Sequence, residues 1–195
     1  MIFVRLLLAA ICLLPGDALA VQSQRSSPDD TSACINTSEA QTLAENFAWL
    51  VASWSLNITY SETLLNATYA EDVHDWSDSI RVLESRGCTN GPEPLDSTRA
   101  QFAADQLNLP PFEFNVIRVW HACDHVTLLW ERPQPGGQRV RGLVVLETLW
   151  QDAGSRGSKG TRQVKTIYSE FNTASWFVNT GVLKPTNCTT TEVLS

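Results

Sequence analysis

Four ionisable side chains lie close together in the stretch from Asp72 to Asp78, which also holds His74 and Asp75. Carboxylates and imidazoles are the groups that most often move protons in enzymes. If the stretch is a strand whose inner face carries Asp75 or Asp78, burial raises the pKa of that carboxyl group and suits it to act as a general base. The alternative is a solvated strand edge on which the aspartates cap turns. Asp75 and Asp78 are therefore the first candidate catalytic residues.

A second ionisable cluster surrounds Cys123, where His121, Asp124 and His125 are near neighbours. A histidine beside a carboxylate can transfer protons near neutral pH, whereas aspartate is also a common turn residue. The two histidines are not spaced to bind a metal from one strand, and no third ligand is evident. We therefore add His121 to the catalytic candidates and expect neither a metal nor a cofactor.

Charged residues also interrupt the apolar strands of the second half, at Arg141, Glu147 and Glu170. Arg141 and Glu147 share one face by parity, so they can form a structural salt bridge or hold a polar ligand between them. Glu170 is the fourth catalytic candidate. The ligand-binding candidates are aromatic or polar side chains in these strands and at the predicted pocket mouth: Trp120, Arg141, Asn172 and Trp176.

The elements that must position these residues follow from hydrophobic periodicity. Apolar residues at helical spacing predict helices over residues 38–54, 61–69 and 97–107, capped by Thr37 or Ser38 in the first and by Asp96 or Ser97 in the third. Alternating and β-branched residues predict strands over 71–83, 112–121, 126–131, 140–149 and 163–171, and a last helical turn over 173–179. Helices followed by an antiparallel meander indicate the α+β class, with a concave mouth suited to a small molecule.

The first twenty residues predict a secretory signal peptide. Arg5 precedes an apolar run that ends at Pro15, and a small-residue cleavage site closes it at Ala20. The run is too short to span a bilayer, so we expect a secreted protein with no membrane anchor. We expect a flexible mature N-terminus over residues 21–33, one domain over 34–182 and a polar tail over 183–195.

Four cysteines remain once Cys12 leaves with the leader. An even number in an oxidising compartment predicts two disulfides. Three pairings are possible, and we favour Cys34 with Cys123 and Cys88 with Cys188. Structural zinc sites need closely spaced pairs, which this chain lacks. Four N-x-[ST] sequons, at Asn36, Asn57, Asn66 and Asn187, predict a glycoprotein.

The composition of the chain excludes some classes of binding partner. The 195 residues carry a formal net charge of −7, which disfavours nucleic acid and anionic membrane surfaces. Hydrophobic residues make up 43% of the chain, enough for a packed core. The seven tryptophans can fill that core or line an apolar pocket, and a small apolar molecule is the partner we expect.

Several short stretches within residues 34–182 match a family pattern: Tyr69-Ala70-Glu71-Asp72, Ser77-Asp78-Ser79-Ile80, Val119-Trp120-His121-Ala122-Cys123-Asp124, Val126-Thr127, Val140-Arg141-Gly142, Val145-Leu146-Glu147 and Ile167-Tyr168-Ser169-Glu170-Phe171-Asn172. On these stretches the chain resembles the nuclear transport factor 2-like (SnoaL-like) superfamily, and most closely a branch of small secreted fungal proteins.

The resemblance implies a cone-shaped fold, a curved antiparallel sheet wrapped over N-terminal helices, and a homodimer formed through the sheet. It also implies a cofactor-free isomerase, cyclase or dehydratase acting on an apolar, polyketide- or terpenoid-like metabolite in a fungal biosynthetic pathway. The catalytic set of ketosteroid isomerase, an aspartate base with a tyrosine and an acid, does not map onto this chain. A non-catalytic secreted ligand-binding protein or effector is the alternative.

Overall fold

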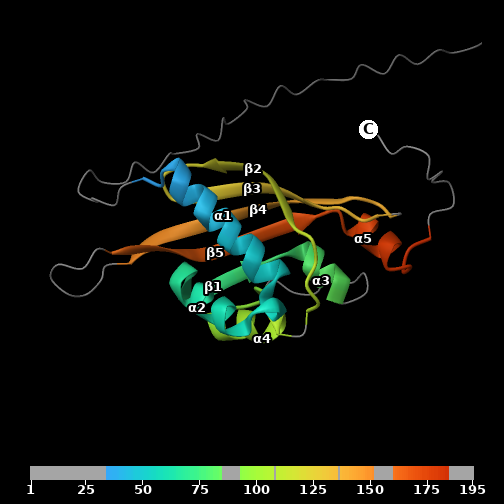
Figure 1. The fold of residues 1–195 in the computed structure, drawn as a ribbon, viewed down its shortest axis with the longest axis horizontal. Coiled ribbons are helices and arrows are strands. Elements are labelled where there is room, and N and C mark those ends of the chain that lie inside the picture. Colours follow the sequence, from blue (N-terminus) through green and yellow to red (C-terminus); the bar gives the residue numbers. More distant parts are fainter. Residues whose placement is uncertain (1–33, 85–92, 108, 136, 152–159, 185–195) are drawn as a thin grey trace, which may run out of the picture. The chain divides into compact units, whose positions relative to one another are not determined.

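The computed structural model describes residues 34–84, 93–107, 109–135, 137–151 and 160–184. The described residues all belong to one compact unit. Helices and a five-stranded sheet make up its described part, which confirms the predicted α+β class (Figure 1). None of the described helices is long and apolar enough to cross a membrane. The predicted signal peptide and the segment 21–33 lie outside the described residues.

The longest helix, α1, spans Thr37–Ala52. Asn36, rather than Thr37 or Ser38, caps it. The side-chain oxygen of Asn36 accepts a hydrogen bond from the Glu39 backbone N–H, and the Glu39 carboxylate accepts one from the Asn36 N–H, both at 3.0 Å. This reciprocal capping box satisfies two N–H groups that the helix itself leaves without partners. The side of α1 that packs into the core carries small and apolar residues at helical spacing: Ala40, Leu43, Ala44, Phe47 and Leu50.

Three further helices lie close to their predicted ranges, each capped by a side chain that accepts a backbone N–H. The short 3-10 helix η1, Trp54–Leu56, leads from α1 into the first of them. They are α2 at Ile58–Thr68 with Asn57 as its cap, α4 at Arg99–Gln106 with Thr98, and α5 at Thr173–Asn179 with Asn172.

The strand predicted over residues 71–83 is wrong in its second half. Strand β1 spans Tyr69–Trp76, and a helix, α3, occupies Asp78–Glu84. The Glu170 carboxylate explains the change, because it accepts hydrogen bonds from the backbone N–H groups of Asp78 at 2.7 Å and Ser79 at 3.1 Å. The first N–H groups of a helix need such partners, and here they come from a residue 91 or 92 positions away.

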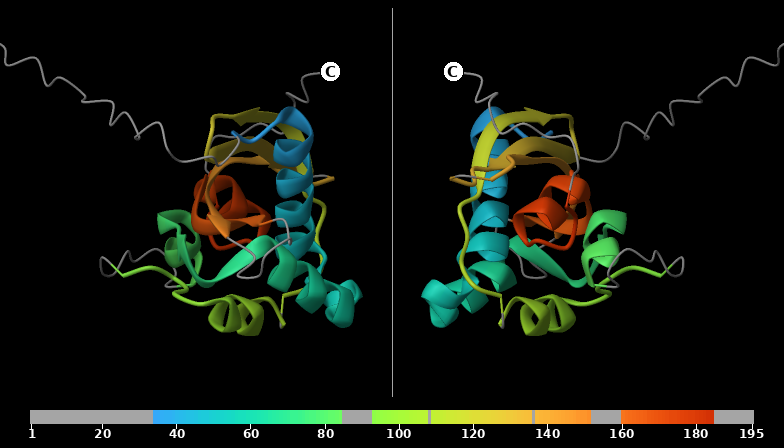
Figure 2. Two further views of the ribbon diagram at one scale, coloured as in Figure 1. Left: turned by 90° about the vertical axis from the view of Figure 1, so that its left-hand side faces the viewer. Right: turned by 90° about the vertical axis from the view of Figure 1, so that its right-hand side faces the viewer.

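The sheet has the order β1-β5-β4-β3-β2. The remaining strands are β2 at Asn115–His121, β3 at His125–Arg132, β4 at Val140–Gln151 and β5 at Thr161–Phe171. Strands β2 to β5 pair antiparallel, as predicted, whereas β1 pairs with β5 in parallel and makes the sheet mixed. The sheet curves, and α1 lies against the side formed by β2 and β3 (Figures 1 and 2).

Strict alternation places one face of the sheet in the core. In β3 the fully or nearly buried residues are Val126, Leu128 and Trp130, and their neighbours along the strand are more exposed. Gly142 in β4 leaves room for Trp130, since a Cβ at residue 142 would lie 2.7 Å from the Trp130 Nε1 atom and 2.6 Å from the Phe171 Cβ atom. A larger residue there would force the buried indole ring to move.

The two edge strands of the sheet, β1 and β2, have different surroundings. Asp96 forms an antiparallel bridge with Asp75 and covers part of the outer edge of β1. No described residue pairs with the outer edge of β2, whose ladder runs only to β3. This difference places two distinct candidate sites at opposite edges of the sheet.

Candidate functional site

Asp75 and Asp96 form a pair of buried carboxyl groups at the edge of β1. Their side chains are 7% and 5% exposed. The Asp75 N–H donates to the Asp96 carbonyl at 2.9 Å, and the Leu95 N–H donates to the Asp75 carbonyl at 2.7 Å. Residues directly opposite each other in an antiparallel pair project their side chains to the same face. The bridge therefore brings two carboxyl groups together in a poorly solvated place.

Burial raises the pKa of both carboxyl groups to about 7. For Asp75 the facing Asp96 adds to the effect of burial. For Asp96 the second contribution is the charge of Asp105, to which it also hydrogen-bonds. Like charges at short range and low dielectric cannot both ionise easily. Near neutral pH each of the two carboxyl groups is therefore partly protonated, so this place can both accept and donate a proton.

The Tyr69 hydroxyl belongs to the same interior. Tyr69 begins β1 and is completely buried, with its ring edge-on to Phe102 at 5.2 Å between centroids. Burial raises the pKa of its hydroxyl well above the ordinary value, and the charge of Asp75 adds to the rise. Neither the Tyr69 hydroxyl nor the Asp75 Oδ1 atom has a hydrogen-bond partner among the described residues. Two buried polar atoms are therefore left to bind something other than the described protein.

Asp78 and Glu170 lie apart from this pair, at the start of α3. The Glu170 carboxylate is engaged by the two α3 backbone N–H groups and by the Ser79 hydroxyl. Asp78 is exposed in the first turn of α3, where its negative charge favours the helix. The contacts of Glu170 are those of a helix cap. The catalytic roles of Asp78 and Glu170 remain predictions, and the geometry described here does not support them.

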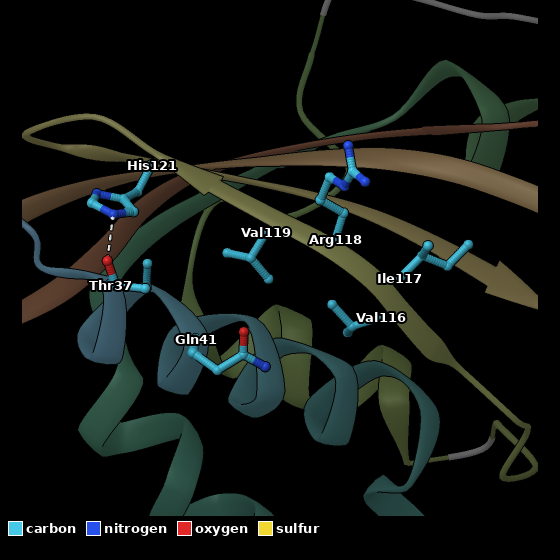
Figure 3. Close-up of a pocket in the computed structure, with 8 residues that line it drawn as sticks. Thr37, Gln41, Val116, Ile117, Arg118, Val119 and His121 are labelled. Atoms are coloured by element: carbon cyan, nitrogen blue, oxygen red, sulfur yellow. Dashed lines mark hydrogen bonds between the residues drawn. The ribbon is translucent and has the colours of Figure 1, made fainter.

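His121 lines a hollow of about 220 Å³ between α1 and β2 (Figure 3). Its Nε2 atom lies 3.2 Å from the Thr37 hydroxyl oxygen, to which it hydrogen-bonds. Val116 and Val119 also border the hollow, and the amide of Gln41 stands on its helix side. A histidine predicted to transfer protons thus lies beside a hydroxyl and an amide rather than a carboxylate.

A second hollow, of about 610 Å³, adjoins the first along α1. It shares Gln41 and Val116 with the first, and it extends past Trp49 to Phe112 and Phe114. Asp75 and Asp96 line neither hollow. The structure therefore does not bring the predicted residues His121 and Asp75 into one site.

Asp124 and His125 form a separate exposed cluster at the turn between β2 and β3. The Asp124 carboxylate pairs with the Nδ1 atom of His125, and the Nε2 atom of His125 lies 3.4 Å from Glu147. The predicted pairing of Arg141 with Glu147 is wrong, because Arg141 pairs instead with Glu131 at 3.1 Å. Cross-strand neighbours explain the choice, since Glu131 is directly opposite Arg141 in the β3–β4 ladder and His125 is opposite Glu147.

The four predicted ligand-binding residues do not converge. Trp120 is 44% exposed and lies beneath the Arg118 guanidinium, 5.8 Å from its ring centroid. Asn172 caps α5 by accepting the Ser175 N–H at 3.1 Å. Trp176 packs edge-on against Phe112, and the Arg132 guanidinium lies 4.6 Å from its ring centroid. Arg141 makes the pair described above, so these four residues surround no common space.

The predicted covalent features are described in part. Cys34 and Cys123 form a disulfide, as we favoured, and it joins the start of α1 to the end of β2. Cys88, Cys188 and Asn187 lie outside the described residues. Asn36, Asn57 and Asn66 are exposed, so their sequons are sterically available, and their glycosylation stays a prediction. Among the described residues no cluster of His, Cys, Asp and Glu could hold a metal ion.

Sequence reasoning missed Asp96, Asp105 and Tyr69 as members of the buried cluster. Asp96 resembled a helix cap, because it precedes α4 by only a few residues. Its actual neighbour, Asp75, comes from a contact across 21 positions. Pro94, which follows Pro92 by two positions, gives a local hint of extended chain just before this contact, because the residue before a proline favours an extended backbone. Nothing in the local pattern marks Tyr69 as unpartnered.

Comparison with known proteins gives a family match. The model of the NTF2-like domain family matches residues 33–183. No curated protein matches the chain significantly.

Solved structures are similar to this chain at low sequence identity. A de novo designed protein with a curved β-sheet is 15% identical over 76% of this chain and 97% of its own, with a TM-score of 0.45. A hypothetical protein with a ketosteroid isomerase-like fold from Catenulispora acidiphila, solved with trimethylamine, is 17% identical over 77% and 100%, with a TM-score of 0.44. A proposed SnoaL-like polyketide cyclase from Shewanella denitrificans is 11% identical over 74% and 98%, with a TM-score of 0.43.

Proposed function

This chain belongs to the NTF2-like domain family, and from that premise we propose that it is a secreted small-molecule pocket protein that catalyses cofactor-free proton transfer. The observation that carries the proposal is the buried Asp75–Asp96 pair, whose pKa values are both raised to about 7. Buried ionisable groups are expensive to keep, and strongly shifted pairs are concentrated at functional sites.

The pair suits isomerisation, cyclisation or dehydration. The ionised carboxylate removes a proton from a carbon next to a carbonyl group. The protonated partner returns a proton to another carbon in isomerisation, or to a hydroxyl group that leaves as water in dehydration. We propose an apolar substrate, namely a polyketide- or terpenoid-like metabolite of a fungal biosynthetic pathway. The unpartnered Tyr69 hydroxyl is placed to donate a hydrogen bond to a substrate oxygen that gains negative charge.

Substrate must reach carboxyl groups that are buried in this conformation. We place the entrance at residues 95 and 96, because they lie along the outer edge of β1 and are attached there by the two backbone hydrogen bonds of the Asp75–Asp96 bridge. Parting these bonds exposes Asp75 without disturbing the pairing of β1 with β5. Amide exchange at Leu95 reports this opening directly.

The proposal is tested with an apolar cyclic β,γ-unsaturated ketone, whose conversion to the conjugated ketone is followed by absorbance. Asp75→Asn should lower the rate at least ~100-fold, because general-base catalysis contributes about 10²–10⁴. Glu62→Gln, which alters an exposed carboxylate on α2, is the control and should keep the wild-type rate. Equal rates for wild type and Asp75→Asn would refute the assignment.

A second candidate is a non-catalytic binding protein or effector. The hollows along α1 favour it, because they are open to solvent and lie away from the carboxyl pair. Failure of the wild-type protein to turn over any apolar ketone, together with binding in these hollows, would select this candidate.

Secretion, processing and assembly complete the proposal. Mass spectrometry of the protein from a secretory host, with and without glycosidase and reductant, should find a terminus after Ala20, sugars on the sequons and two disulfides.

A homodimer through the sheet is supported by exposed apolar side chains on its outer face: Trp120 at 44%, Leu143 at 49% and Tyr168 at 43%. Tyr168→Asp should then yield a monomer in analytical ultracentrifugation.

A further inference from the structure

The hollows between α1 and β2 form one continuous groove, since Gln41 and Val116 line both of them. One wall is α1 with Ser53 just after it, and the other is β2 together with the residues just before it. Figure 3 shows β2 running along α1, with the Gln41 side chain on α1. The groove lies on the far side of the sheet order from Asp75, so this inference is independent of the proposed catalysis.

The backbone of β2 borders this groove. Four successive β2 residues, Val116 to Val119, line the first hollow. Successive side chains of a strand point to opposite faces. A hollow that touches all four must therefore lie against the edge of the strand, where the main-chain groups are, and not against one face only.

Two sets of main-chain groups point out of the β2–β3 ladder toward the groove. The Ala122 N–H donates to the His125 carbonyl at 2.9 Å and closes the turn. Hydrogen-bonded and non-hydrogen-bonded pairs alternate along an antiparallel ladder. The pairs of Val119 with Leu128 and of His121 with Val126 are then the non-hydrogen-bonded ones. The N–H and C=O groups of Val119 and His121 therefore point away from β3, and both residues line the groove.

The dimensions fit one added strand. The seven residues of β2 extend for ~24 Å at about 3.4 Å per residue. The sixteen residues of α1 extend for ~24 Å at about 1.5 Å per residue. The helix wall and the strand edge thus have matching lengths, and an extended segment about as long as β2 would fill the space between them.

The charges of the groove select the occupant. Arg118 and His121 line the first hollow, and Glu45 lines the second. An antiparallel segment would place its amino-terminal half at the Arg118 end. It would therefore carry an acidic residue there and a basic residue near Glu45. The β2 sequence itself, Asn115–His121, contains no acidic residue, so the edge of a second copy offers no counter-charge to Arg118.

We propose that the edge of β2 binds an extended peptide of a partner protein, which adds as a sixth, antiparallel strand along α1. Main-chain hydrogen bonds from Val119 and His121 hold the peptide, and its alternate apolar side chains enter the two hollows. The peptide is acidic toward its amino end and basic toward its carboxyl end.

The test uses the full chain and a synthetic seven-residue peptide, acetylated and amidated, with valine at alternate positions, glutamate near its amino end and lysine near its carboxyl end. Amide hydrogen exchange with and without the peptide should show at least ~10-fold slower exchange at Val119 and His121. Exchange of the Trp120 amide, whose backbone N–H points toward β3, should not change. A peptide N-methylated at the amides that face β2 should bind at least ~10-fold more weakly, and one N-methylated on its other edge should bind equally.

Two matched variants locate the site. Gln41→Trp fills the junction of the two hollows and should abolish binding. Thr42→Trp changes the next exposed residue of α1, which lines neither hollow, and should bind normally. The proposal is overturned by any of three results: no binding at millimolar peptide, equal binding of both N-methylated peptides, or protection of Val119 and His121 that grows with protein concentration alone and so reports a second copy.

Discussion

The two edge strands of this sheet expose the same kind of main-chain groups but have opposite surroundings. The edge of β1 is covered by residues 95 and 96, and the cover buries two carboxyl groups. The edge of β2 faces an open groove, and the ionisable side chains beside it, Arg118 and His121, are exposed. An uncovered edge invites another strand.

The comparison shows that covering an edge has an electrostatic cost. At β1 the added segment satisfies backbone groups, yet it brings Asp96 against Asp75 and raises both pKa values. At β2 no described segment is added, and the nearby charges keep their solvent. The covered edge is therefore suited to chemistry that needs desolvated groups, and the open edge to recognition that needs free main-chain groups.

The largest expected effect concerns the anchoring of the open edge. The Cys34–Cys123 disulfide joins α1 to the end of β2 and closes a loop of 89 residues. Replacing both cysteines, with Cys34→Ser and Cys123→Ser, should lower the free energy of unfolding by ~3–5 kcal/mol, because the unfolded chain regains the entropy of that loop. Urea denaturation of wild type and variant measures the difference. A loss below ~1 kcal/mol would mean that other contacts alone hold α1 to β2.

The next effect tests the covered edge through pH. Asp75 has a pKa of about 7 in the folded protein against 3.8 in the unfolded chain, so the folded state binds more protons between these values. The stability contributed by protonated Asp75 is complete below about pH 4, falls as pH rises, and is lost above about pH 7, for a total on the order of 4 kcal/mol.

Asp75→Asn should therefore leave stability at pH 4 nearly unchanged and raise it at pH 8 relative to wild type. Thermal unfolding across this pH range gives the measurement, with Glu62→Gln as the control for an exposed carboxylate. A variant whose stability tracks wild type at every pH would show that Asp75 is solvated, and the contrast between the two edges would fail.

A smaller effect is expected where Glu170 supports the covered side of the sheet. Glu170→Gln keeps an acceptor but removes the charge that binds the N–H groups of Asp78 and Ser79. Hydrogen bonds to charged groups contribute ~1.5–3 kcal/mol, so we expect a loss of ~2 kcal/mol in chemical denaturation. Faster amide exchange should be confined to α3. Exchange that rises equally in α1 would place the role of Glu170 elsewhere.

The smallest effect concerns the helix that borders the open edge. Asn36→Ala removes the cap of α1 and should cost ~1 kcal/mol. Asn36→Asp keeps an oxygen that accepts the Glu39 N–H and should cost little, although it also abolishes the sequon. Both proteins, made in a non-glycosylating host, separate the capping role from any role of a sugar. Equal losses would contradict the capping assignment.

Local patterns predicted most of the elements, and the reasons are visible in particular residues. The alternation of Val126, Leu128 and Trp130 identified β3, and the spacing of Leu43, Phe47 and Leu50 identified α1. In each case the apolar residues recur at the spacing that places them on one face of the strand or helix. The alternation from Asp75 to Ser79 predicted a strand throughout. The helix begins at Asp78 because the distant Glu170 carboxylate binds the first N–H groups of that helix.

The candidate site was predictable only in part for the same reason. The sequence left open whether Asp75 or Asp78 lies on the inner face of the strand, and the structure buries Asp75. Its partner Asp96 and the hydroxyl of Tyr69 depend on how separate segments meet, and no local periodicity carries that information. Likewise, the groove at β2 exists because that strand is last in the sheet order, which is a property of topology and not of its own residues.

The parallel pairing of β1 with β5 sets an order of events during synthesis. Residues 69–76 leave the ribosome early, but their partners are Val164 and Thr166 to Tyr168, so β1 has no neighbour in the sheet until almost the whole chain has been made. Long-range pairings of this kind form late and slowly. A truncated or stalled chain would therefore retain a solvent-accessible Asp75, and chaperones that bind unpaired strands would meet β1 before β5 does.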